Sequence, residues 1–257
     1  MTDTQKTAAF FDLDRTLIAG SSAFVFARAA YDAGHIRPRD FAGDAIGALK
    51  FRFFGSSDQS SLGVRDRILS AAGGVKQQDL EALNEIVLPE LLGLIRPEAR
   101  ALLEQHHAAG RETWIVSASP IEIVEPLAIA LEMTGGIGTR GEVDNGVYTG
   151  RLDGPFCYGE GKAQAISALA KDRNINLSDS WSYSDSMSDV PMMELVGNAV
   201  AVNPDAQLAT LARARGWPVV VFAQRSKMLI RRSTTITAVV AGMAFAFSLG
   251  ARYGRRN

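Results

Sequence analysis

The sequence predicts an α/β fold built on a mostly parallel sheet, and two observations support this prediction. Short apolar runs recur along the chain, and helical patterns lie between several of them. Strands buried on both faces are continuous apolar runs, and strands that alternate with helices form parallel sheets covered on both sides. The predicted strands are Ala8–Phe11, Thr113–Val116, Trp181–Ser184, Ala199–Val202 and Val219–Phe222.

Helices are expected between the later strands. The segment Pro97–Ala109 has proline at its start and glycine after its end, the positions where each is favoured. The segments Lys162–Asp172 and Asp205–Arg215 have apolar residues three and four apart, as an amphipathic helix requires. A further helix is expected at Val190–Val196. The pair Asn145-Gly146 lies between short apolar segments and predicts a β-hairpin turn.

Between Ile18 and about Leu92 the alternation stops. This region holds helix-like stretches and no convincing strand, so we expect a helical insertion between the first and second strands. The stretches are Ser22–Asp32, Phe41–Phe51, Ser61–Ala71 and Gln78–Leu94.

Composition and charge exclude several classes of protein. The chain has 257 residues, 47% hydrophobic and 21% charged, which is ordinary for a globular protein with its own core. The single cysteine cannot form an internal disulfide, and the presence of only three histidines argues against a histidine-built zinc site. The segment Met1–Lys6 does not resemble a secretory signal. We therefore expect a cytoplasmic location. The 20 basic and 28 acidic residues before Arg225 argue against nucleic acid as a partner.

Polar residues follow the predicted strands, or open a predicted helix, at four places. Asp12 and Asp14 follow the first strand and are two residues apart, so both can face one site. Ser117-Ala118-Ser119 ends the second strand, Gly159–Lys162 opens a helix, and Ser184–Asp189 follows the third strand. Strand ends of this kind are where open α/β sheets bind ligands.

Each of these features has a chemical and a structural interpretation. Paired carboxylates suit nucleophilic and acid–base chemistry, hydroxyls and free N–H groups suit phosphate oxygens, and acidic loops suit Mg²⁺. Taken singly, however, the aspartates could be solvated loop residues, the serines helix caps and Lys162 a surface lysine.

Together and in this order, the four features resemble the motifs of the haloacid dehalogenase superfamily. The match comprises a hydrophobic strand followed by DxDxT (Phe11–Thr16), then Ser117, Lys162 and the acidic pair Asp185 and Asp189. It spans about residues 7–224 and is most similar to the phosphoserine-phosphatase-like subfamily IB hydrolases. The resemblance implies a Rossmann-like core at residues 1–17 and 93–225, with an inserted helical C1 cap at residues 18–92.

The resemblance also implies a reaction and a site. The reaction is Mg²⁺-dependent hydrolysis of a small phosphomonoester, with Asp12 as the nucleophile and Asp14 as the general acid and base. Phosphate or substrate contacts are implied for Ser117, Ala118, Lys162 and Arg67. Magnesium is implied between Asp12, the backbone carbonyl of Asp14 and Asp185, with Thr16, Ser188 and Asp189 in supporting roles.

Departures from the phosphoserine-specific pattern leave the substrate open. Those members carry Glu where this chain has Ser21 and Asn where it has Ser188, and the correspondence of Arg67 is loose. A phosphoserine-like substrate and a lipid or glycerol phosphate therefore both stay open. Two other functions also stay open: phosphoryl transfer to an acceptor other than water, and a non-catalytic regulatory module tethered to a membrane.

The C-terminal tail, residues 226–257, differs from the rest of the chain. Its segment Thr234–Ala251 has no charged residue and is flanked by arginines on both sides. About 18 residues is the short end of a membrane span, and basic flanks favour anionic lipid. The tail is therefore predicted either to anchor the protein in a membrane as a hydrophobic helix, or to pack on the core or on a second copy.

Overall fold

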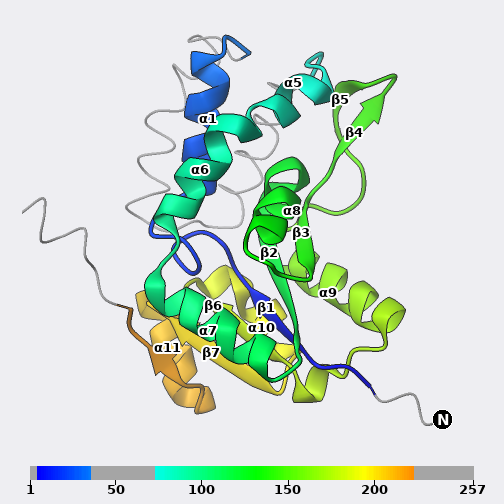
Figure 1. The fold of residues 1–257 in the computed structure, drawn as a ribbon. Helices are drawn as coiled ribbons and strands as arrows, with labels where there is room; N and C mark the ends of the chain where they lie inside the picture. The colour runs from blue at the N-terminus through cyan, green and yellow to red at the C-terminus, as the bar shows by residue number, and fades with distance from the viewer. Residues whose placement is uncertain (1–4, 36–72, 223–257) are drawn as a thin grey trace, which may run out of the picture. The chain divides into compact units, whose positions relative to one another are not determined.

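The computed structural model describes residues 5–35 and 73–222 (Figure 1). Its described residues contain a six-stranded, fully parallel sheet in the order β3-β2-β1-β6-β7-β8. This confirms the predicted α/β class. The strands are β1 (Ala8–Phe11), β2 (Glu112–Pro120), β3 (Gly135–Thr139), β6 (Trp181–Ser184), β7 (Asn198–Val202) and β8 (Val219–Val220).

The described helices largely follow the sequence periodicity. The predicted helix at Ser22–Asp32 has the predicted bounds, whereas the single helix predicted at Gln78–Leu94 is two helices that meet at Leu83. The helices are α1 (Ser22–Asp32), α5 (Gln77–Ala82), α6 (Asn84–Leu94), α7 (Pro97–Ala108), α8 (Ile121–Ala130), α9 (Glu160–Arg173), α10 (Val190–Glu194) and α11 (Ala206–Arg215). The 3-10 turns are η1 (Leu177–Asp179) and η2 (Met187–Asp189).

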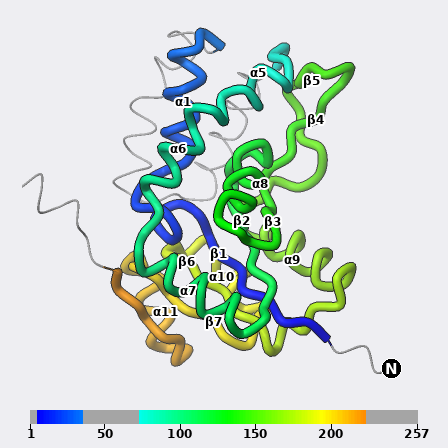
Figure 2. Tube along the Cα trace, in the orientation of Figure 1, coloured from blue at the N-terminus to red at the C-terminus, as the bar shows by residue number. Residues whose placement is uncertain are grey.

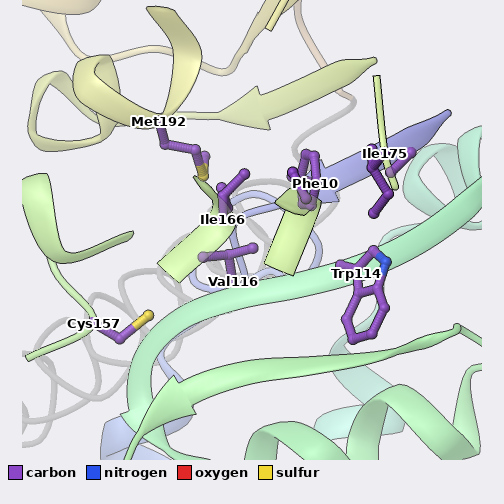
Figure 3. Packing of buried hydrophobic residues seen from close by; sticks show 9 residues of the cluster. Phe10, Trp114, Val116, Cys157, Ile166, Ile175 and Met192 are labelled. Carbon is purple, nitrogen blue, oxygen red and sulfur yellow. The ribbon is translucent and has the colours of Figure 1, made fainter. Parts of the chain in front are cut away.

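Helices cover both faces of the sheet. Successive residues of β1 point to opposite sides, so this apolar strand contributes to the core on each face. On one face Phe10 belongs to a buried cluster with Val116, Ile166 of α9 and Met192 of α10 (Figure 3). On the other face the ring of Phe11 stacks on that of Tyr183, and His106 of α7 contacts both rings. A strand apolar at every position is the sequence consequence of this double burial.

Two elements at one edge of the sheet were not predicted, namely β3 and α8. The strand β3 is rich in glycine, which weakens a strand signal. Its glycines are needed because a Cβ atom at Gly135 would lie 2.6 Å from the Trp114 ring, and one at Gly136 would lie 2.8 Å from Val124. Close packing against a neighbouring helix and ring thus replaces side-chain propensity as the determinant of this strand.

The predicted hairpin is confirmed as β4 (Gly141–Asp144) paired antiparallel with β5 (Val147–Leu152). Asn145 and Gly146 both have positive φ values, of 49° and 78°, as a two-residue hairpin turn requires.

The connection from β1 to β2 leaves the sheet at the carboxyl end of β1 and returns through α6 and α7 (Figure 2). Helix α1 packs against α6, and α6 packs against α8. The predicted helices at 41–51 and 61–71 lie outside the described residues, and the division into core and cap stays a prediction.

The predicted hydrophobic tail helix, with its membrane or packing role, also lies outside the described residues. Within residues 5–35 and 73–222, no helix has the length and apolar character that a bilayer crossing needs.

Candidate active site

The predicted site residues that the structure describes lie near the carboxyl end of the parallel sheet. Phe11, the last residue of β1, pairs with Ile115 of β2 and Tyr183 of β6. Continuing this register places Ser117 and Asp185 beside the loop that starts at Asp12. Three motifs that lie far apart in the sequence therefore converge because parallel strands all end on the same side.

Lys162 lies at the centre of a buried group that we call the lysine cluster: Asp12, Lys162, Ser184 and Asp189. The ammonium of Lys162 donates to Asp12 Oδ1 at 2.6 Å and to Asp189 Oδ2 at 2.9 Å. The hydroxyl of Ser184 donates to the same oxygen of Asp189 at 2.7 Å. All four residues are at most 7% exposed, so each buried charge has a partner, as burial of charge demands.

Two glycines place Lys162 in this position. Gly159 precedes α9 with a φ of 54°, a conformation that side chains disfavour. A Cβ atom at Gly161 would lie 1.9 Å from the carbonyl oxygen of Phe156, so only glycine permits this approach. The lysine near the helix N-terminus is thus held where two carboxylates, rather than solvent, balance its charge.

The electrostatics of this edge show a shortage of positive charge. Burial, together with the carboxylates of Asp189 and Asp185, outweighs Lys162 and raises the pKa of Asp12 to about 8. Burial is also the main reason why the pKa of Asp185 rises to about 6, although Arg15 opposes it. An additional cation at this edge would lower both pKa values.

Arg15 is a residue that the sequence analysis did not assign to the site. Its guanidinium forms an ion pair with the carboxylate of Asp185, and its backbone has a φ of 63°. Because its side chain is 56% exposed while that of Asp185 is 4% exposed, Arg15 covers a buried carboxylate from the solvent side. The sequence gives no spacing signal for this contact.

Asp14 belongs to a second group that we call the serine cluster: Asp14, Ser21, Ser22 and Ser119. Ser22 donates to Asp14 Oδ1 twice, from its backbone N–H at 2.8 Å and from its hydroxyl at 2.6 Å. The hydroxyl of Ser21 donates to Asp14 Oδ2 at 3.2 Å. The hydroxyl oxygens of Ser22 and Ser119 are 2.6 Å apart. Burial raises the pKa of Asp14, and the bonds from Ser22 and Ser21 oppose that rise.

The remaining predicted residues have simpler surroundings. Ser117 is buried, and its hydroxyl oxygen accepts the backbone N–H of Ser119 at 3.2 Å. The backbone carbonyl of Ala118 accepts a bond from Thr139. The buried hydroxyl of Thr16 has no hydrogen-bond partner among residues 5–35 and 73–222. Ser188 forms hydrogen bonds with Ser186. Arg67, the predicted substrate-binding arginine, lies outside the described residues.

The donor set suits a divalent cation bound with few protein ligands. In the described part of the chain, no three Asp, Glu, His or Cys side chains gather as a complete metal site. Mg²⁺, however, is usually held by one or two carboxylates together with waters and substrate phosphate. Asp12 and Asp185 supply that number, and a cation beside them would oppose the burial and the neighbouring carboxylates that raise their pKa values.

Comparisons with known proteins agree with this geometry. Residues 9–194 match the haloacid dehalogenase-like hydrolase family. The chain is 38% identical over 249 residues to phosphoserine phosphatase SerB1 of Mycobacterium tuberculosis, covering 96% of this chain and 78% of that protein. It is 30% identical over 225 residues to a histidinol-phosphatase of Neisseria meningitidis, covering 84% and 99%. A crystal structure of a Bordetella pertussis protein of unknown function superposes with a TM-score of 0.72 at 28% identity, covering 84% and 99%.

Proposed function

The chain belongs to the haloacid dehalogenase-like hydrolase family, and we propose that it hydrolyses a small phosphomonoester through an aspartyl-phosphate on Asp12. The observation that carries the proposal is the convergence, at the end of β1, of a buried Asp12 paired with Lys162 and an Asp14 held by hydroxyls. A carboxylate can approach a phosphate only where positive charge is near. Lys162 supplies that charge from within the chain.

In the first step an oxygen of Asp12 attacks phosphorus and the bond to the ester oxygen breaks. The electron pair goes to the ester oxygen, which takes a proton from Asp14 and leaves as an alcohol. In the second step Asp14 takes a proton from water, whose oxygen attacks phosphorus and frees Asp12. Ser117 and Lys162 hold phosphate oxygens in both steps.

We propose Mg²⁺ as the cofactor, held by Asp12, Asp185 and the backbone carbonyl of Asp14. When bound, the ion supplies further positive charge to the phosphate oxygens. Lys162 keeps Asp189 and Asp12 in place, and Arg15 keeps the carboxylate of Asp185 at the site edge. Both arrangements orient this chain's own ligands before the ion arrives.

We propose a phosphate ester of an aliphatic alcohol as the substrate class. Two of the similar proteins are named for phosphate esters of aliphatic alcohols, serine and histidinol. Alkoxides are poor leaving groups, so such esters need the proton that Asp14 donates.

The test is phosphate release from a panel of esters: phosphoserine, histidinol phosphate, glycerol phosphate, lysophosphatidate and p-nitrophenyl phosphate. We expect Mg²⁺-dependent release from p-nitrophenyl phosphate and from at least one aliphatic ester, and loss of that release with a chelator. Asp12→Asn is the matched control for contaminating phosphatases. Wild-type activity no higher than that of Asp12→Asn on every ester would reject the proposal.

A further inference from the structure

The contacts of Asp14 distinguish its two carboxylate oxygens. Oδ1 accepts two short bonds from Ser22, one from the N–H and one from the hydroxyl, which use both of its lone pairs. Oδ2 accepts a single longer bond from the hydroxyl of Ser21, an exposed residue. A proton on the carboxyl group is therefore accommodated on Oδ2 and not on Oδ1.

The number of hydroxyl protons also sets the direction of the hydrogen bond between the buried residues Ser22 and Ser119. Ser22 has one hydroxyl proton, and it is given to Asp14 Oδ1. The hydroxyl of Ser119, 2.6 Å from that of Ser22, must then donate to Ser22. A hydroxyl that accepts a hydrogen bond becomes a stronger donor, so Ser119 strengthens the hydrogen bond from Ser22 to Asp14.

These serines come from two elements of the fold, α1 and β2. Ser22 is the first residue of α1, and Ser119 lies near the end of β2, where its N–H donates to Ser117. Ser21, at the N-cap position of α1, makes no capping bond with its side chain. The hydroxyls near the start of this helix therefore serve Asp14 rather than the helix itself.

From this geometry we propose that Ser22 and Ser119 are positioning residues that fix Asp14 through Oδ1, so that Oδ2 is the atom that gives the proton to the leaving alcohol and later takes one from water. This inference deepens the proposed hydrolysis and rests on it. Each transfer moves one proton between Oδ2 and a substrate or water oxygen, while Oδ1 keeps its bonds to Ser22.

The test compares two esters of the panel. One is the aliphatic ester that the wild-type protein turns over fastest, which has a poor leaving group, and the other is p-nitrophenyl phosphate, whose leaving group needs little protonation. Ser22→Ala should lower kcat for the aliphatic ester by roughly tenfold or more, with KM nearly unchanged, and lower kcat for p-nitrophenyl phosphate by less than about threefold. Ser22→Thr, which keeps the hydroxyl, should recover most of the loss. Ser119→Ala should show the same selectivity with a smaller loss.

The decisive arm places each substitution in an Asp14→Asn background, where a residue acting through Asp14 has no further effect. Ser182→Ala is the matched control, because Ser182 is also fully buried but its hydroxyl has no hydrogen-bond partner within the described part of the chain. Ser119→Ala leaves both bonds from Ser22 to Asp14 in place, so it tests the proposal even where Ser22→Ala lowers the yield of folded protein.

Equal losses on both esters, or an undiminished loss in the Asp14→Asn background, would overturn the positioning role. These outcomes differ from failure of the proposed function, in which the wild-type protein itself would release no phosphate from any ester.

Discussion

The lysine cluster and the serine cluster hold two aspartates of one motif in different ways. Asp12 is held by an ammonium that it shares with Asp189, whereas Asp14 is held by hydroxyls and a backbone N–H. Burial raises the pKa of both carboxyl groups. Charge suits the nucleophile proposed to meet an anionic phosphate, and neutral donors suit the acid and base proposed to bind and release a proton.

The largest effect is expected in the lysine cluster. Asp12→Asn keeps the shape of the side chain but replaces a carboxylate by an amide, which is a very poor nucleophile towards phosphorus. We expect turnover of every ester to fall by about 10⁴ or more, irrespective of the leaving group. Steady-state phosphate release and a circular-dichroism check of folding measure this. Substantial turnover in a folded Asp12→Asn protein would assign the nucleophile to another residue.

The serine cluster should give a smaller and more selective loss. Asp14→Asn removes the proposed proton donor but leaves the proposed nucleophile, so kcat should fall by roughly 10²–10⁴ for aliphatic esters. The fall should be weaker for p-nitrophenyl phosphate, because its leaving group departs without a proton. A plot of log kcat against leaving-group pKa should steepen in this variant. An unchanged slope would remove Asp14 from the acid role.

The sequence was sufficient to predict the backbone position of most site residues, but not their partners. Strand ends and a helix start are encoded locally, by apolar runs and by glycines, so Asp12, Lys162 and Asp185 could be placed at one edge. The contacts of Arg15 and Ser22 depend on how a loop and α1 pack together, which no local pattern records. Two consecutive serines at the start of a helix, Ser21 and Ser22, are the local feature that could have indicated the second group.

The same distinction explains what was missed in the fold. The strand β3 is fixed by the close approach of Trp114 and Val124 to its glycines, a tertiary effect that overrides a weak local propensity. By contrast β1 and β6, which are central and apolar or small at every position, were predicted with their observed bounds.

A third prediction concerns the pH dependence of stability and tests whether the lysine cluster lacks enough positive charge to keep Asp12 ionised. Because the pKa of Asp12 in the folded protein is about 8, against an ordinary value of 3.8, the folded state keeps a proton that the unfolded state has lost. The unfolding free energy of the chelator-treated protein should therefore fall, by about 1 kcal/mol, as the pH rises from about 7 to 8.5. Urea titrations at several pH values measure this slope.

Two controls sharpen this prediction. Asp12→Asn should remove the contribution of Asp12 to the slope while leaving any contribution of Asp14, whose pKa burial also raises. Saturating Mg²⁺ should reduce the slope, since a bound cation lowers the pKa of Asp12. The pKa values of Asp185, about 6, and of His106, about 4, lie below this pH range, so these two groups contribute little to the slope. Stability that is flat or rises over this range in the wild-type protein would contradict the assignment.

The smallest effect on catalysis is expected from deleting residues 226–257, which separates both clusters from the predicted membrane segment. The family match ends at residue 194 and the last strand of the sheet at Val220, so turnover of a water-soluble ester should stay within about twofold. Binding to anionic vesicles should fall, because the deletion removes the long uncharged run and six of the seven basic residues from Arg225 onward, each worth about 1 kcal/mol near such a surface. Co-sedimentation of the full and shortened chains with phosphatidylserine vesicles measures the second effect, with neutral vesicles as the control. Full-length protein that stays in the supernatant with both vesicle types would reject the anchor, whereas loss of turnover on deletion would show that the tail belongs to the catalytic fold.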